Sequence, residues 1–232
     1  MISRLLSSLF ALVSPKCCAC CGSRLGIDER VFCTSCDLAM PRRRDVDDPL
    51  NNSTARLFWG VADVERCAAW FDYEAHTKHA DAIYALKYGD RPDIAFAFGK
   101  VIAAELQPTG FFDGIDCIVP LPLHPKRQRE RGYNQSREFA LGLCSVLHIG
   151  LCADAVLRQR NTKSQASLTH GERSTNVKGA FGVVSPEALM GKHVLLVDDI
   201  VTTGATLSEC IRAINKDTDA KVSVLTIGRA KH

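Results

Sequence analysis

The sequence has little net charge, no long apolar run and no internal repeat. Its 232 residues carry a formal charge of only +3 at pH 7, so any surface that binds a polyanion must be local. No apolar run reaches the roughly 18 residues that a membrane-spanning helix needs, which argues against membrane insertion. The pattern GxxxxGK followed by Ser or Thr is absent, which argues against an ATP-driven P-loop motor. With 46% apolar and 24% charged residues, the composition is that of a folded globular protein.

Cysteine, in contrast, is abundant and unevenly placed. The chain has 11 cysteines, and six of them fall between Cys17 and Cys36. A secreted disulfide scaffold would be shorter and would pair its cysteines, so the cluster indicates a metal site in a reducing compartment. We therefore expect a cytoplasmic protein. The other five cysteines stand in apolar contexts, where we expect them to be small core residues.

The spacing within the cysteine cluster predicts a zinc site, with a redox CxxC pair or disulfides as the alternatives. One CxxC pair is Cys33 and Cys36, and the overlapping run CCACC supplies the second pair. A glycine turn lets backbone N–H groups point at sulfur, so Gly22 favours Cys18 and Cys21 as the second ligand pair. Cys17 and Cys20 remain spare or alternative ligands. Four thiolates make a closed, structural zinc site rather than a catalytic one, with about one zinc per chain. The predicted ligands are Cys18, Cys21, Cys33 and Cys36.

Strand-like and helix-like segments alternate from about residue 60 onward. This alternation predicts an α/β fold with a mostly parallel, Rossmann-like sheet and right-handed crossovers. Ligands bind such sheets at the carboxyl ends of the strands. The expected strands are 64–73, 116–123 and 221–229, the expected helices are 79–89, 92–107 and 136–149, and 192–216 holds a strand, a loop and a helix.

The composition divides the chain into three parts. Residues 1–40 are expected to form an N-terminal helix, at 1–16, followed by a small double zinc-ribbon-like module with four cysteine ligands. A signal peptide is the alternative for the N-terminal helix, but Pro15 and Lys16 make a poor cleavage site. Residues 41–59 mix proline, charge and asparagine and read as a linker. Residues 60–232 form the α/β domain.

The segment HVLLVDDIVTTGAT, residues 193–206, predicts a sugar phosphate site. Asp198 and Asp199 follow an apolar run and offer strong acceptors for vicinal hydroxyls,. The loop after them opens a helix, where exposed N–H groups and the helix dipole favour a phosphate. In the alternative interpretation the acidic pair only ends a strand and the loop only caps a helix. The predicted phosphate loop is Thr202, Thr203, Gly204, Ala205 and Thr206.

A cationic cluster lies in the loop expected after the strand at 116–123. Arginine binds phosphate oxygens bidentately, so this cluster at the same sheet edge could clamp a pyrophosphate and stabilise charge. There are two alternative interpretations of the cluster. It could bind a single-stranded nucleic acid, with Tyr133 as a stacking platform, or it could be a solvated run of charges. A further polar segment, 157–181, would suit a lid or a surface connection,. The cluster consists of Lys126, Arg127, Arg129 and Arg131.

Residues 194–206, VLLVDDIVTTGAT, are very similar to the motif by which type I phosphoribosyltransferases bind phosphoribosyl diphosphate (PRPP). Together with the CxxCG…CxxC pattern, this motif and three further blocks resemble the ComF family, named for a role in DNA uptake by competent cells. The three blocks are LKYGD (86–90), PLPLHPKRQRERGYNQS (120–136) and RQRNTKSQ…ERSTNVKGAF (158–181).

The resemblance implies a type I phosphoribosyltransferase-like domain behind the zinc module. By resemblance, Asp198 and Asp199 contact the ribose hydroxyls, and 202–206 holds the 5′-phosphate. The implied activity, in nucleotide metabolism, is transfer of phosphoribosyl from Mg²⁺–PRPP to a nitrogen nucleophile with release of pyrophosphate. The alternative is a non-catalytic accessory protein that binds PRPP or single-stranded DNA alongside competence proteins. A homodimer is a further expectation.

Overall fold

The computed structural model describes residues 17–159 and 179–231. The helix expected at 1–16 and residues 160–178 of the polar segment lie outside the described residues. None of the described helices is long and apolar enough to cross a bilayer.

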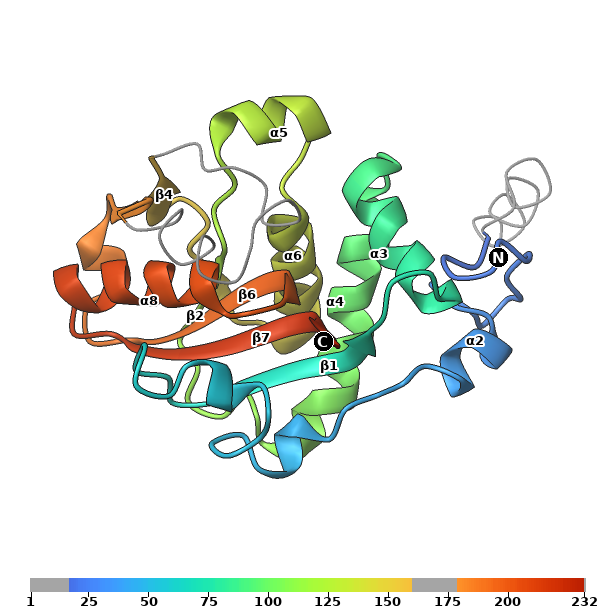
Figure 1. Cartoon of the computed structure of the whole chain (residues 1–232), viewed down its shortest axis with the longest axis horizontal. Coiled ribbons are helices and arrows are strands. Elements are labelled where there is room, and N and C mark those ends of the chain that lie inside the picture. Colours follow the sequence, from blue (N-terminus) through green and yellow to red (C-terminus); the bar gives the residue numbers. More distant parts are fainter. Residues whose placement is uncertain (1–16, 160–178, 232) are drawn as a thin grey trace.

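A five-stranded parallel sheet forms the centre of the molecule, in the order β1-β7-β6-β2-β3 (Figure 1). All of its neighbouring strands pair in parallel, which confirms the predicted sheet. The crossover helices between parallel strands bury both faces, so the strands are almost continuously apolar. The strands are β1 (Cys67–Tyr73), β2 (Cys117–Pro120), β3 (Gly150–Leu151), β6 (His193–Val201) and β7 (Lys221–Ala230).

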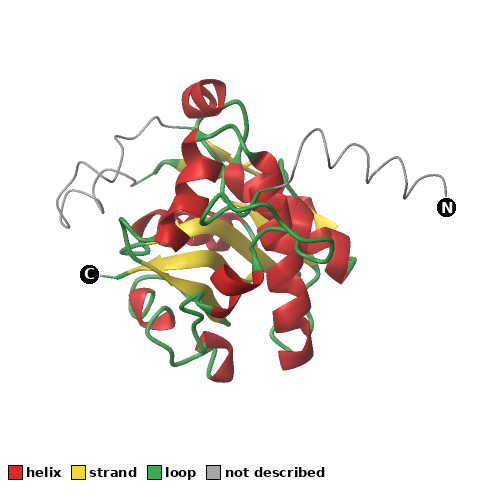
Figure 2. Ribbon diagram, turned by 90° about the vertical axis from the view of Figure 1, so that its right-hand side faces the viewer, coloured by secondary structure: helices red, strands yellow, loops and turns green. Residues whose placement is uncertain are grey.

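Helices cover both faces of the sheet (Figures 1 and 2). Residues of α3, α4 and α6 share one apolar core, and those of α8 belong to a second core with β4 and β5. The helices are α2 (Thr34–Leu38), α3 (Lys78–Tyr88), α4 (Pro92–Leu106), α5 (Pro125–Arg131), α6 (Gln135–Leu147) and α8 (Ala205–Asp217), with 3₁₀ turns at Asp45–Asp47, Ala55–Leu57, Gln107–Thr109 and Pro186–Ala188.

Helices α4 and α6 are in direct backbone contact. A Cβ atom on Gly99 would lie 2.3 Å from the carbonyl oxygen of Phe139, and one on Gly142 would lie 2.1 Å from that of Phe96. Both distances are far inside van der Waals contact, so only glycine fits at either position. The contact fixes α6 beside the sheet and thereby sets the position of its first turn.

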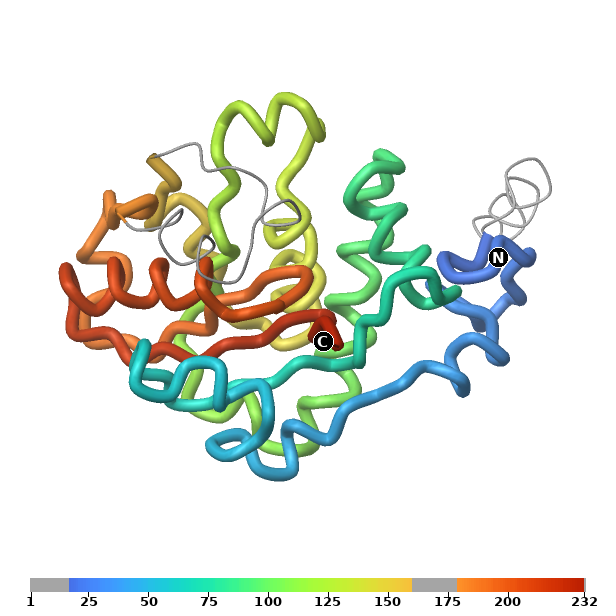
Figure 3. Tube along the Cα trace, in the orientation of Figure 1, coloured from blue at the N-terminus to red at the C-terminus, as the bar shows by residue number. Residues whose placement is uncertain are grey.

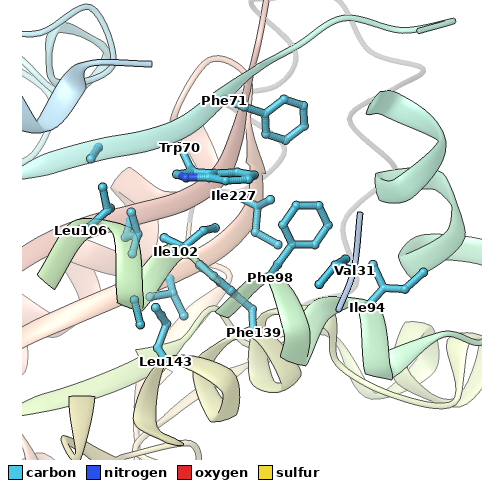
Figure 4. Packing of buried hydrophobic residues seen from close by; sticks show 14 of the residues in the cluster. Val31, Trp70, Phe71, Ile94, Phe98, Ile102, Leu106, Phe139, Leu143 and Ile227 are labelled. Carbon is cyan, nitrogen blue, oxygen red and sulfur yellow. The ribbon is translucent and has the colours of Figure 1, made fainter. Parts of the chain in front are cut away.

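The cysteine segment shares the core of the α/β domain. Val31 and Phe32 are 5% exposed and belong to the apolar cluster of the α3, α4 and α6 face. The Phe32 ring centroid lies 5.1 Å from that of Phe98 and 6.4 Å from that of Trp70. Figure 4 shows Val31 beside Ile94 and Phe98. The two parts of the chain are therefore packed on each other.

Residues 41–59, predicted as a linker, run beside β1 (Figure 3). The carboxylate of Asp45 is buried there and accepts hydrogen bonds from Thr54 and from the guanidinium of Arg43. Asn52 donates to the carbonyl of Cys67 at 2.7 Å. Because buried polar groups need such partners, this network holds the segment against the sheet. The division of the chain at residues 40 and 59 stays a prediction.

Three of the differences between the structure and the sequence predictions bear on the candidate site. The cationic segment was expected to be a loop, but Pro125–Arg131 is the helix α5. Strand β6 does not end at Asp198 and Asp199, because pairing with β7 carries it on to Val201. A small antiparallel sheet, β4 (Val156–Arg158) and β5 (Phe181–Val183), flanks residues 160–178 and was not predicted.

Candidate functional site

A cleft of about 260 Å³ opens at the carboxyl ends of β2 and β6. Ligands bind open parallel sheets at this edge. Its lining brings together the acidic pair, part of the phosphate loop and part of the cationic cluster, which are far apart in the sequence. The charged residues among those that line it are Lys87, Arg127, Arg131, Arg158, Asp198 and Asp199.

Asp198 is held by two hydrogen bonds. Its Oδ1 accepts from the Oγ of Ser136 at 2.8 Å and from the backbone N–H of Asp199 at 2.9 Å. Ser136 lies in the first turn of α6, where Asn134 caps the helix by accepting from its backbone N–H. The sequence therefore places a short hydroxyl side chain at a fixed helix start, facing the strand that carries the aspartate.

Asp199 is paired with a cation from a distant helix. Its Oδ1 lies 3.2 Å from the Nζ of Lys87, near the end of α3, and also accepts from the backbone N–H of Ile200 at 2.6 Å. Only 8% of Asp199 is exposed. A buried carboxylate needs such compensation, and Lys87 supplies the opposite charge,.

The two neighbouring carboxyl groups have different electrostatic environments. Burial raises the pKa of Asp198 to about 7, and the negative charge of Asp199 acts in the same direction. The hydrogen bond from Ser136 and the charge of Lys87 oppose this rise in pKa. Asp198 therefore gains or loses a proton near neutral pH, as is common for a carboxyl group buried beside a second one,.

The raised pKa predicts that Asp198→Asn stabilises the protein above neutral pH. Between the ordinary pKa near 3.8 and the folded pKa of about 7, the folded chain holds a proton that the unfolded chain has lost. Native stability therefore falls as the pH rises through this window. The amide accepts the same two hydrogen bonds without the charge, so the variant should melt higher at pH 8, by roughly 2–4 °C per kcal/mol relieved.

Thermal melts of both proteins from pH 4.5 to 8 measure this difference, which should shrink toward the acid end. A constant offset across that range would show that Asp198 does not titrate there.

The phosphate loop forms a second, smaller hollow of about 60 Å³ beside the acidic pair. It lies at the start of α8, a 13-residue helix whose N-terminus favours an anion,. Gly204 caps the helix with φ at +75°, where a side chain would be strained, and a Cβ there would lie 3.3 Å from Leu57,. Thr203 lines neither hollow, unlike the other predicted loop residues, Thr202, Gly204, Ala205 and Thr206.

Only part of the cationic cluster faces the cleft. Arg127 and Arg131 are one turn apart on α5 and line it, whereas Lys126 and Arg129 are exposed and do not. Arg158 of β4 joins them, only 8% exposed and with its guanidinium carbon 5.4 Å from the centroid of the Phe181 ring. Burial lowers the pKa of Arg127 and of Arg158, and a neighbouring arginine lowers each further.

Guanidinium groups stay protonated despite such a shift. The depressed pKa values therefore record like charges held close together in a partly buried site. Such an arrangement is relieved by a bound anion with several charges.

Three site residues escaped the sequence analysis as site residues. Lys87 belongs to the block LKYGD, and Ser136 is the last residue of the block 120–136. Nothing in the sequence around either residue indicates which aspartate it contacts. Arg158 was assigned only to the polar segment. Tyr133 was proposed as a stacking platform, but it is partly buried and its hydroxyl donates to the carbonyl of Leu86. The tyrosine of this region that lines the cleft is Tyr88.

The cysteine cluster lies apart from this cleft. The Sγ atoms of the four predicted ligands all lie within 4.8 Å of one another, and those of Cys21 and Cys33 are 3.7 Å apart. Tetrahedral zinc with bonds of about 2.3 Å places its sulfur ligands about 3.8 Å apart. Gly22 has φ at +72°, as a tight turn after Cys21 requires. The four thiols, Cys18, Cys21, Cys33 and Cys36, could therefore hold a metal ion.

Comparison with known proteins finds a phosphoribosyl transferase domain in the second half of the chain. A family model described as phosphoribosyl transferase domain matches residues 134–228. Competence protein F of Haemophilus influenzae is 35% identical over 116 residues, 50% of this chain and 51% of that protein. Competence protein ComFC of Bacillus subtilis is 32% identical over 114 residues, 49% of this chain and 44% of that protein. The chain is thus similar to competence proteins of the ComF type over about half of its length.

A longer match is to the DNA utilization protein YhgH of Escherichia coli K12. It is 34% identical over 150 residues, 63% of this chain and 65% of that protein. The chain thus spans less than two thirds of these relatives. Among solved structures, the glutamine PRPP amidotransferase of B. subtilis matches at a TM-score of 0.42 and 18% identity, over 62% of this chain and 30% of that one.

Proposed function

We propose that this chain is a member of the ComF family that binds Mg²⁺–PRPP and transfers its phosphoribosyl group to a nitrogen nucleophile, with release of pyrophosphate. The observation that supports this most strongly is that a cleft with hydrogen-bond acceptors adjoins a hollow with hydrogen-bond donors. Asp198 lines both the larger cleft and the small hollow at the start of α8. Acceptors for hydroxyls thus adjoin donors for a phosphate, which is the chemistry that a ribose 5-phosphate requires.

The proposed placement follows from these groups. Asp198 and Asp199 accept hydrogen bonds from the 2′- and 3′-hydroxyls, and the hollow of residues 202–206 takes the 5′-phosphate. Arg127, Arg131 and Arg158 face the same cleft and are proposed to hold the pyrophosphate,. Lys126 and Arg129, exposed on α5, are assigned no direct contact.

Magnesium is proposed as the partner of the diphosphate. Mg²⁺ prefers oxygen ligands and is held largely by substrate phosphates and water, and the carboxylates of Asp198 and Asp199 are the matching donors in this cleft,. When bound, the ion neutralises charge on the leaving pyrophosphate. The second proposed metal, structural zinc on the four cysteines, takes no part in the reaction.

The proposed reaction needs positioning and charge stabilisation rather than a covalent nucleophile. The bond between C1 of the ribose and the pyrophosphate oxygen breaks, and its electron pair leaves with the pyrophosphate. The nitrogen lone pair forms the new bond to C1, and the nitrogen loses a proton. Arginine side chains stabilise the charge that develops on the leaving group, while the carboxylates keep the ribose oriented.

Calorimetric titration of Mg²⁺–PRPP into the full chain tests the binding. We expect saturable binding that Arg127→Gln weakens about tenfold, because hydrogen bonds to charged groups contribute about 1.5–3 kcal/mol each. Lys126→Gln, a matched change one residue away but on the exposed side of α5, should bind like the native protein. Absence of PRPP binding by the folded native chain would refute the proposal. Equal weakening by the two variants would refute the placement of the pyrophosphate.

A second candidate function is an accessory protein that handles single-stranded DNA. The exposed cations of α5, Lys126 and Arg129, favour it, as do the names of the similar proteins, which refer to competence and DNA utilization. Contacts with phosphates of a strand release counterions, so binding of an oligonucleotide would weaken steeply with salt. Its proposed partners would be competence proteins in the cytoplasm, with a homodimer as the proposed assembly.

A further inference from the structure

Asp198 is anchored through only one of its two carboxylate oxygens. Both of its hydrogen bonds end on Oδ1, one from the Oγ of Ser136 at 2.8 Å and one from the backbone N–H of Asp199 at 2.9 Å. Within residues 17–159 and 179–231, no donor bonds to Oδ2. Because Asp198 lines both hollows, Oδ2 is the oxygen left to accept a hydrogen bond from a ligand.

The neighbouring carboxylate is anchored in the same way. Oδ1 of Asp199 meets both the Nζ of Lys87, at 3.2 Å, and the backbone N–H of Ile200, at 2.6 Å. Its Oδ2 likewise has no donor in the part of the chain that the structure describes. Two such acceptors on adjacent residues match the two vicinal hydroxyls of a ribose. The uncharged anchor of the pair is the hydroxyl of Ser136.

The position of Ser136 is fixed relative to the strand that carries Asp198. The side-chain oxygen of Asn134 accepts from the backbone N–H of Ser136 at 3.0 Å, and the side-chain nitrogen of Asn134 donates to the carbonyl of Leu121 at 3.1 Å. Leu121 directly follows β2, and its own backbone N–H donates to the carbonyl of Val197, the residue before Asp198. A chain of hydrogen bonds therefore connects the start of α6 to β2 and β6, and it sets the distance between the hydroxyl and the carboxylate.

The hydroxyl of Ser136 does not serve its own helix. Asn134 already caps α6, and the Oγ of Ser136 donates to β6 instead of to a carbonyl of α6. Ser145, on the same helix, shows the ordinary arrangement, because its Oγ donates to the carbonyl of Gly142 at 2.7 Å,. Ser136 is only 4% exposed, so its hydrogen bond is shielded from competing water. The contact is thus better explained by what it does to Asp198 than by a contribution to α6.

We propose that Ser136 is a positioning residue for the ribose. Its hydroxyl holds Oδ1 of Asp198 in one orientation, so that Oδ2 accepts a hydrogen bond from one of the vicinal hydroxyls. The inference rests on the proposed binding of PRPP and adds a residue that acts through Asp198. A side chain that is oriented before the ligand arrives loses less conformational entropy on binding, which strengthens binding.

A double-mutant cycle, measured by calorimetric titration of Mg²⁺–PRPP into the full chain, tests the inference. Ser136→Ala should bind about tenfold more weakly than the native chain, the size of effect expected when a hydrogen bond to a charged group is lost. In the background of Asp198→Ala the same serine change should cost little further affinity, because the group through which the hydroxyl acts is gone. Ser136→Thr keeps the hydroxyl and should bind like the native chain.

Ser145→Ala is the matched control. It is the same change on the same helix, but Ser145 is exposed and lies outside the cleft lining. Its affinity for Mg²⁺–PRPP should equal that of the native chain. Thermal melts of every variant show whether it is folded at the temperature of the titration.

The possible results separate the inference from the function on which it rests. If the native chain does not bind PRPP, both are overturned. If it does, the inference alone is overturned when Ser136→Ala binds like the native chain or when Ser136→Thr binds as weakly as Ser136→Ala. An equal loss with and without the carboxylate of Asp198 also overturns it, because Ser136 would then act on the ligand directly. So does a Ser136→Ala chain that is unfolded during the titration, because the hydroxyl would then serve the fold.

Discussion

Asp198→Asn combined with Asp199→Asn is expected to abolish measurable binding of Mg²⁺–PRPP, with at least a hundredfold loss of affinity. Each carboxylate is proposed to accept a hydrogen bond from a ribose hydroxyl, and a charged acceptor is worth about 1.5–3 kcal/mol. The loss of both, at 1.4 kcal/mol for each tenfold change, gives roughly a hundred- to ten-thousandfold. Calorimetric titration at pH 8 measures it.

Thermal melting of this variant separates lost binding from unfolding, since Asp199→Asn removes the carboxylate partner of Lys87 and so opposes the gain at position 198,. The structure predicts that the asparagine at position 198 stabilises the chain, because the burial that raises the pKa of Asp198 opposes its charge. Lost affinity in a protein that melts no lower than the native one cannot be attributed to unfolding. Asp217→Asn, at the exposed far end of α8, is the control and should bind normally. Native-like PRPP binding by the double variant would remove the acidic pair from the site.

Cys36→Ser is expected to release the bound zinc and to destabilise the whole chain. Structural zinc supplies about 10–16 kcal/mol of apparent binding free energy in small zinc-finger peptides, and even a part of this is comparable with the net stability of a domain. Val31 and Phe32, which lie between the two CxxC pairs, pack in the core with Phe98 and Trp70. Loss of the metal therefore removes support from the α/β domain as well.

Metal analysis and thermal unfolding in reducing buffer measure these effects. The native chain should carry about one zinc, and Cys36→Ser should carry none and unfold at a clearly lower temperature. Cys17→Ser is the control, since Cys17 is exposed and outside the four-thiol group, and it should keep its zinc. The zinc hypothesis fails if the native chain purifies without zinc or if Cys36→Ser retains it.

Local signals in the sequence predicted most of the fold. The long helices were placed within a residue or two because their ends carry readable signals: Thr77 caps α3, Gly89 ends it, and Pro92 starts α4,. The same signals existed for α5, where Pro125 stands at the first position and Gly132, with φ at +80°, follows the last. There the density of charge suggested a loop, which was wrong.

The end of β6 could not be read from the sequence, because it depends on a neighbouring strand. Two aspartates and a run of threonines are typical of a strand end, but β7 continues to Ala230 and offers paired backbone groups as far as Val201. Propensity in strands is overridden by such context.

The sequence predicted the site residues that are neighbours along the chain. It did not predict those that come together only in the folded structure. The acidic pair and most of the phosphate loop lie together because one strand, loop and helix carry them. Lys87 meets Asp199 only because α3 ends beside β6, across more than a hundred residues of chain, and no local pattern encodes that pairing. The choice of Arg127 over Lys126 likewise depends on which side of α5 faces the cleft, a question that arises only once the segment is known to be helical.

The continuation of β6 past the acidic pair has a consequence for how tightly a ligand can be held. Residues of a free loop lose conformational entropy when a ligand orders them, and this loss subtracts from affinity. Asp198 and Asp199 instead sit within a strand that is paired with β7 on both sides of them, at Val197 and at Ile200. Their backbone is already ordered before any ligand arrives. The acidic pair is thus preorganised for its ligand. Adjustment of the cleft to different ligands is left to side chains of the other elements that line it, among them α3 and α5.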